Sequence, residues 1–131
     1  MYKEVIIARS DGSDEPTPLL ANAATPFRYK QIFGEDLLTL FANAESEEGG
    51  RKRYNIDFLP ELAYVMAMQA KAKNDKKVKL DTLNNSQFID WLEQYDGLAI
   101  ENACEEIIDV YLGNTRHGSE AKKNNVEPKE S

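Results

Sequence analysis

The sequence has almost none of the residues that hold soft metals or form disulfides. Cys104 is the only cysteine and His117 the only histidine among 131 residues. A lone cysteine excludes a disulfide within the chain, and a reducing compartment is the default for such a composition. A zinc site built from several cysteines and histidines is excluded for the same reason. We therefore expect no metal.

Long apolar runs are also missing. No stretch approaches the roughly 18–20 apolar residues of a membrane span. The N-terminus MYKEVIIARSDG lacks the basic start and extended apolar core of a secretory signal. Hydrophobic residues make up 41% and charged residues 30% of the chain, which is typical of a small globular domain. We expect a cytoplasmic protein.

Positive charge is scarce, and the formal net charge is −7. An acidic body repels nucleic acid and anionic membranes at long range, so protein is the expected partner. The segment KAKNDKKVK (71–79) holds five lysines and could be read as a nucleic-acid patch. No arginine or aromatic residue interrupts it, which favours a solvated helix end and loop.

Residue patterns that carry catalysis are absent too. Glu105, Glu106 and Asp109 lie opposite the apolar stripe of their segment, as on the outer face of an amphipathic helix. Cys104 falls on that stripe, which favours packing over nucleophilic chemistry. No glycine-rich loop has the spacing of a phosphate site. The sequence predicts a protein that is not an enzyme and needs no cofactor.

What is present is a short hairpin signal and a series of helical patterns. Residues 4–8 (EVIIA) are typical of a strand, residues 10–18 of a turn, and Leu19 and Leu20 could start a return strand. Helices are expected from Thr25 to Phe41, from about 58 to 73, after residues 84–86, and from about 98 to 112. The charged connection 45–53 is expected to be a solvated loop. Residues 115–131 have little to bury and are expected to be disordered.

These patterns predict a mainly α fold. It comprises a helical domain over residues 1–114, with about four helices and an N-terminal β-hairpin, followed by a polar tail over 115–131. Thr25 and Asp57 are expected helix caps, and Pro26 suits the first position of its helix. Gly34 either breaks its helix in two or admits another backbone.

The aromatic-rich segment 24–41 presents apolar residues on more than one face. At 100° per residue a stripe is expected to be buried, comprising Phe27, Phe33, Leu37, Leu38 and Phe41. The segment could simply be the central helix of the fold. Residues outside the stripe must still meet a second surface, which could belong to another chain. We therefore predict partner-binding residues here and at two off-stripe positions of the next helix: Tyr29, Ile32, Leu40, Tyr64 and Met68.

The chain resembles the tail assembly chaperones of long-tailed siphophages, in particular the small acidic proteins of phages and prophages of Gram-positive bacteria. The resemblance starts at NAATPFRYKQIFGEDLL (22–38) and continues through LPELAYVMAMQA (59–70) and FIDWLEQYD (88–96). The order and spacing of the three segments carry it, over about residues 1–114.

This resemblance implies a protein that is not an enzyme. Family members are thought to coat the long tape measure protein and keep it soluble until tail tube subunits polymerise around it. The implied partners are the tape measure protein, the tail tube protein and a frameshifted longer form of the chaperone itself, with self-association possible. The implied location is the host cytoplasm, without incorporation into the mature virion.

Two other classes are compatible with the sequence. A helical adaptor or anti-repressor that binds a phage or host protein would have a similar composition. A minor structural tail component would also look similar, but it would be found in the finished particle.

Overall fold

The computed structural model describes residues 1–48, 51–54 and 56–113 of the chain. The protein is mainly helical and begins with a two-stranded antiparallel hairpin, as the sequence predicts. Strands β1 (Tyr2–Val5) and β2 (Thr17–Leu20) pair in the register Tyr2↔Leu20 and Val5↔Thr17. The predicted tail, 115–131, lies outside the described residues.

The segment from Thr25 to Ala44 forms two helices rather than one. Helix α1 (Thr25–Phe33) ends at Gly34, whose φ of 78° is left-handed, and α2 (Leu37–Ala44) starts three residues later. Gly34 donates its backbone N–H to the carbonyl of Lys30 and so closes the last turn of α1. Helices commonly end at a glycine in the αL conformation, so the predicted break at Gly34 is confirmed.

Replacing Gly34 with alanine should therefore destabilise the protein by about 1 kcal/mol, because a side chain at positive φ is strained. Inside a continuous helix the same change would stabilise by a similar amount. Thermal unfolding of the variant shows directly whether the substitution stabilises or destabilises the protein. Gly97→Ala is the control, because Gly97 has no positive φ and open space around it. A higher Tm for Gly34→Ala than for the unmodified protein would contradict the break.

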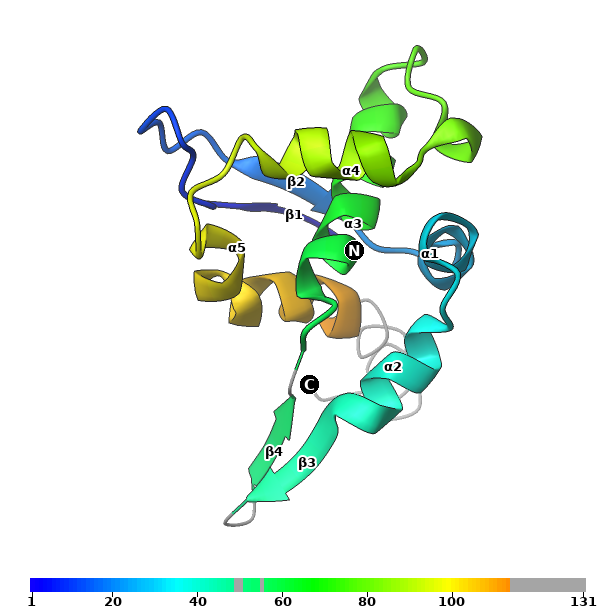
Figure 1. Cartoon of the computed structure of the whole chain (residues 1–131), viewed down its shortest axis with the longest axis vertical. Coiled ribbons are helices and arrows are strands. Elements are labelled where there is room, and N and C mark those ends of the chain that lie inside the picture. Colours follow the sequence, from blue (N-terminus) through cyan, green and yellow to red (C-terminus); the bar gives the residue numbers. More distant parts are fainter. Residues whose placement is uncertain (49–50, 55, 114–131) are drawn as a thin grey trace, which may run out of the picture.

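Helix α3 (Leu59–Asn74) is the central element of the fold. It packs against β2, α1, α4 (Asn85–Leu92), α5 (Ala99–Asn102) and the short 3-10 helix η1 (Leu80–Thr82). Figure 1 shows it running through the middle of the molecule, with other elements on several sides. A helix that is apolar on nearly all sides is buried on nearly all sides. The alternative that the segment 24–41 is the central helix is therefore wrong.

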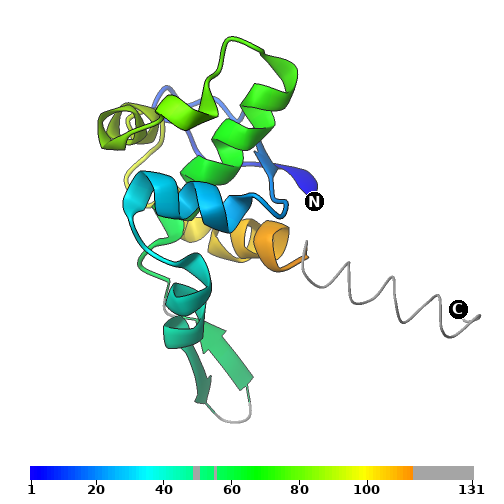
Figure 2. The same ribbon diagram turned by 90° about the vertical axis from the view of Figure 1, so that its right-hand side faces the viewer.

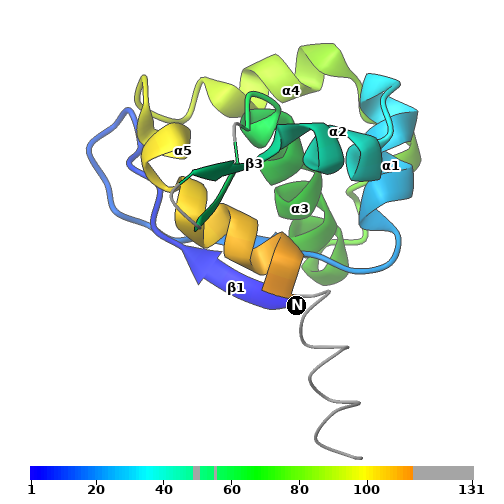
Figure 3. The ribbon, with the colours of Figure 1, turned by 90° about the horizontal axis from the view of Figure 1, so that it is seen from below.

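The C-terminal half of the domain covers α3 from two directions. Helix α4 starts with a capping box in which Asn84 and Gln87 exchange side-chain and backbone hydrogen bonds, as the predicted cap region allows. The expected fourth helix is interrupted at Ala103, so α5 is followed by a separate helix at 104–113. Figure 3 shows this last helix lying along β1, where Lys3 and Glu106 approach to 3.9 Å.

The charged connection is a β-hairpin, which corrects the expectation of a solvated loop. Strands β3 (Glu45–Glu48) and β4 (Arg51–Tyr54) are antiparallel, with Glu47 opposite Lys52 and Glu48 opposite Arg51. Figure 2 shows the hairpin projecting from the body beyond α2. The hairpin therefore forms the end of the molecule that lies beyond α2.

Buried polar contacts tie the N-terminal hairpin to the helices. Gln69 of α3 donates from its side-chain amide to the carbonyl of Leu20 at 2.7 Å and to the hydroxyl of Thr25 at 2.8 Å. Thr25 is fully buried and lies inside α1, so the expectation that it caps the helix is wrong. Asp57 provides no cap either, because α3 begins after Phe58 without a side-chain cap. Gln69 was not singled out by its sequence pattern.

Candidate functional site

Two of the five predicted partner-binding residues belong to the core. Tyr29 and Tyr64 are each only 1% exposed. The ring of Tyr29 lies 5.1 Å from that of Phe33, and the ring of Tyr64 lies 5.3 Å from that of Phe88 and 5.5 Å from that of Trp91. The expectation that these two side chains lie on a free surface is therefore wrong. Both rings contact aromatic rings that lie outside their own helices.

The other three predicted residues are neither fully buried nor fully exposed. Ile32, Leu40 and Met68 are partly buried and pack against the hydrophobic core. They lie on three different helices, α1, α2 and α3. None is a large exposed apolar side chain, although each retains a partly accessible edge. The five predicted residues do not form one surface.

The exposed apolar side chains of this region are two residues that the sequence pattern assigned to the core. Phe27 is 77% exposed in the first turn of α1, and Leu38 is 64% exposed in the first turn of α2. The other three residues of the predicted stripe are assigned correctly, because Leu37 and Phe41 are buried and Phe33 packs against the core. The break at Gly34 resets the helical phase, so one wheel drawn through residues 25–41 fails for Phe27 and Leu38. We call the exposed sides of these two helices the α1–α2 surface, defined by Phe27, Lys30, Gln31, Leu38 and Ala42.

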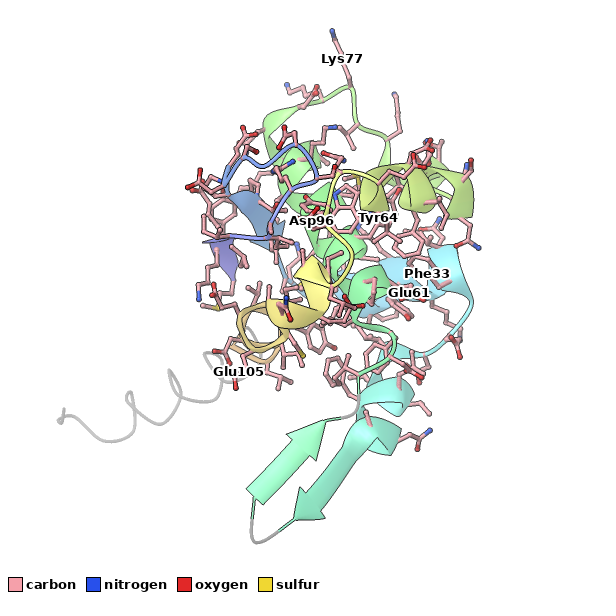
Figure 4. The ribbon with its side chains drawn as sticks, turned by 60° about the vertical axis from the view of Figure 1, so that its left-hand side comes forward. Phe33, Glu61, Tyr64, Lys77, Asp96 and Glu105 are labelled. Atoms are coloured by element: carbon pink, nitrogen blue, oxygen red, sulfur yellow. The ribbon has the colours of Figure 1, made fainter. Side chains whose placement is uncertain are left out.

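Acidic residues surround the point where α1, α2 and α3 meet. Glu35 lies between α1 and α2, Asp57 precedes α3, and Glu61 lies in the first turn of α3, where Figure 4 labels it. Burial raises the pKa of Glu61, and the nearby charges of Asp57 and Glu35 raise it further. Burial also raises the pKa of Tyr29, again helped by these three carboxylates. We call Glu35, Asp57 and Glu61 the acidic corner.

The partial burial of Glu61, together with this repulsion, predicts that Glu61→Gln stabilises the protein at neutral pH. A carboxyl group whose pKa is raised on folding opposes folding once it is ionised, and the penalty vanishes where it is protonated in both states. We expect Tm to rise by about 2–4 °C at pH 7, corresponding to roughly 0.5 kcal/mol. The gain should disappear below pH of about 4, under the ordinary glutamate range.

Differential scanning fluorimetry at several pH values measures the Glu61 effect. Glu101→Gln is the matched control, because Glu101 is exposed on α5, away from the acidic corner. An equal Tm for Glu61→Gln and the unmodified protein at pH 7 would show that the corner carries no repulsion.

The predicted acidic face on the last helix is exposed. Glu105, Glu106 and Asp109 point outward at 104–113, while Ile107, Val110 and Tyr111 are buried. Figure 4 labels Glu105 on the outer side of this helix. Cys104 is partly buried, and burial raises the pKa of its thiol, with the charges of Glu105 and Glu101 adding to the effect. A raised thiol pKa opposes formation of the nucleophilic thiolate.

An open cavity of about 380 Å³ lies between α3, the segment after it, and α4. Three lysines, two aromatic rings and a methionine are prominent in its wall: Tyr64, Met68, Lys71, Lys77, Lys79 and Trp91. We call this cavity the lysine-rimmed groove. A second cavity of about 320 Å³ shares Met68, Lys71 and Trp91 with it and extends toward β2. The sequence pattern located the lysines on a helix end and loop but did not indicate a cavity.

Two other features are absent from the described part of the chain. Among residues 1–48, 51–54 and 56–113, no three histidine, cysteine or acidic side chains are grouped to hold a metal ion. Within the same residues, no helix is both long and apolar enough to cross a membrane.

Comparisons with family models, with curated proteins and with solved structures find no match for this chain.

Proposed function

We propose that this protein is a tail assembly chaperone of a siphophage. It binds the tape measure protein through the α1–α2 surface, keeps that protein soluble in the host cytoplasm, and helps recruit tail tube subunits. It does no chemistry and leaves the complex before the virion is complete.

The exposure of Phe27 and Leu38 is the observation that supports this proposal best. Both residues lie within residues 22–38, the first of the three segments whose order and spacing carry the family resemblance. Large apolar side chains left in water on neighbouring helices suit the apolar face of a partner helix. The partly buried edges of Ile32 and Leu40 lie on the same two helices and can widen the contact when a partner binds.

Charge explains how a protein with exposed apolar residues could keep a partner in solution. The acidic corner lies at the α1–α2 junction, and Glu105, Glu106 and Asp109 form a second acidic face on the last helix. Several copies bound along one tape measure protein would repel each other's outer faces and those of neighbouring complexes. The net charge of −7 is the source of that repulsion.

Co-expression tests this function. The tape measure protein of the same phage is produced with and without the full chain, and its soluble fraction is measured. We expect it to be soluble and to co-purify only when the chain is present. An equally insoluble tape measure protein in both cultures would overturn the proposal. Detection of the chain in purified virions would instead favour a structural tail component.

A further inference from the structure

The hydroxyl of Tyr64 is buried and finds no hydrogen-bond partner among the residues that the structure describes. Figure 4 shows Tyr64 between α3 and α4, and its side chain forms part of the wall of the lysine-rimmed groove. Burial raises the pKa of this phenol, and Asp90 raises it further. The hydroxyl is therefore protonated at neutral pH and can donate a hydrogen bond. Buried polar groups without a partner are rare in folded proteins, and each one calls for an explanation.

The charges at the groove contrast with the rest of this acidic protein. Lys71 projects from the last turns of α3, and Lys77 and Lys79 from the segment that follows. All three are exposed and contribute to the wall of the cavity. Asp90 is the acidic side chain of that wall, so the wall carries a net positive charge. A positive recess on a negative body attracts negative groups selectively.

The remaining wall combines apolar side chains with the uncharged polar residues Thr82, Gln87 and Gln94. Met68 and Trp91 belong to both neighbouring cavities, and Val78 and Leu83 contribute to the larger one. Its volume of about 380 Å³ lies in the range of small binding pockets. It can therefore accept a large apolar side chain, while the lysines can reach charges on either side of it.

We propose that the lysine-rimmed groove binds an acidic peptide segment of a partner protein that carries a central apolar anchor. The anchor lies against Met68, Val78 and Leu83, next to Trp91. Flanking carboxylates pair with the lysines, and Tyr64 donates its hydroxyl hydrogen to a carboxylate or peptide carbonyl. The groove lies at the end of the molecule opposite the β3–β4 hairpin, as Figures 1 and 2 show for the segment after α3. It is therefore distinct from the α1–α2 surface, and the inference is independent of the proposed function.

A peptide fits this groove better than a nucleic acid. A phosphate backbone needs an extended positive track, whereas these lysines surround a recess and the protein has a net charge of −7. Aromatic stacking of bases also needs accessible ring faces. Trp91 is only 7% exposed, so it offers little face for stacking.

Trp91 is the only tryptophan, and its fluorescence reports binding in the groove directly. The probe is the peptide acetyl-Glu-Glu-Phe-Leu-Glu-Glu-amide, titrated into the full chain with excitation at a wavelength where only tryptophan absorbs. We expect a saturable change in emission. The charge-reversed peptide, with lysine in place of every glutamate, should give none. A saturable response to both peptides, or to neither, overturns the proposal.

Variants test which residues are responsible. Lys71→Gln/Lys77→Gln/Lys79→Gln should raise the peptide Kd by about tenfold, since three exposed ion pairs are lost. Lys3→Gln/Lys52→Gln/Lys73→Gln removes the same charge at positions outside the groove and should change Kd by less than about twofold, within the spread of neutral surface changes. Tyr64→Phe removes only the hydroxyl and should raise Kd by about fivefold.

Equal effects of the two lysine triples would mean that the peptide responds to overall charge, and the groove assignment would be wrong. An unchanged Kd for Tyr64→Phe would remove the hydroxyl from the contact and overturn that part of the assignment. Inorganic phosphate and oligouridylate are titrated in parallel. Tighter binding of either one, with the same dependence on the three lysines, would show an anion or RNA site and contradict the peptide proposal.

Discussion

Under the proposed chaperone function, we expect that replacing Phe27 and Leu38 with serine abolishes capture of the tape measure protein without unfolding the chain. Both side chains are mostly exposed, so their removal from the free protein should change its stability by no more than about 0.5 kcal/mol. If both are buried on binding, their loss weakens the complex by about 2–4 kcal/mol in total. That corresponds to a roughly 30- to 1,000-fold increase in Kd. Co-purification and Tm are measured on the same preparations.

A matched control removes exposed apolar side chains from elsewhere on the surface. Ile89 is 52% exposed on α4 and Leu98 is 69% exposed before α5. The double variant Ile89→Ser/Leu98→Ser should capture the partner as well as the unmodified protein does. Equal loss of capture in both double variants would show that general surface hydrophobicity, and not the α1–α2 surface, holds the partner.

Replacing Tyr29 and Leu40 with serine will have the opposite character, because it will destabilise the fold. Truncation of a buried aromatic side chain costs about 3–5 kcal/mol, and a small domain has only about 5–15 kcal/mol in total. The rings of Phe33 and Phe58 lose their contacts with Tyr29, at centroid distances of 5.1 and 6.5 Å. We expect Tm to fall by at least about 12 °C. Circular dichroism during heating measures this loss.

Phe27→Ser is the control for that result, since it removes an aromatic side chain from the same helix without opening the core. Its Tm should remain close to that of the unmodified protein. A stable Tyr29→Ser/Leu40→Ser variant that has lost partner binding would instead restore the original prediction from sequence, that these two residues form the binding surface.

Much of the fold could be predicted from local sequence signals. The β-branched residues at 4–8 and the turn residues after them indicated the N-terminal hairpin, and any of residues 84–86 could cap the next helix, which Asn84 does in α4. Turn chemistry and caps act over a few residues, so they can be read without knowledge of the packing. The same holds for the acidic outer face at Glu105, Glu106 and Asp109.

The α1–α2 surface could not be predicted, because the rotation of α2 relative to α1 depends on the conformation of Gly34. A helix drawn straight through Gly34 places Phe27 and Leu38 inside and Tyr29 outside. The αL conformation of Gly34 starts a new helix with a different rotation, so the single wheel fails for Phe27, Tyr29 and Leu38, although Leu37 and Phe41 are buried as it predicts. The sequence showed that Gly34 could break the helix, but the angle between the two helices depends on tertiary packing.

The central position of α3 is also a tertiary property. Its alanines and Gln69 are weak signals in a hydrophobic pattern, yet Ala63, Ala67 and Ala70 are all buried where neighbouring elements approach closely. The β3–β4 hairpin was missed because glutamate and lysine have low strand propensity, so the residue types did not indicate the pairing that the backbone adopts. The groove brings together residues from position 64 to position 94, and local patterns do not reveal such contacts.

Site-specific photocrosslinking is the most direct test of the claim that the α1–α2 surface binds the tape measure protein. p-Benzoylphenylalanine is introduced at position 27, at position 38 or, as the control, at position 89, and each variant is irradiated with the co-expressed partner. We predict a crosslinked product from positions 27 and 38 and none above background from position 89. Crosslinking from position 89 alone, or equal yields from all three positions, would contradict the account.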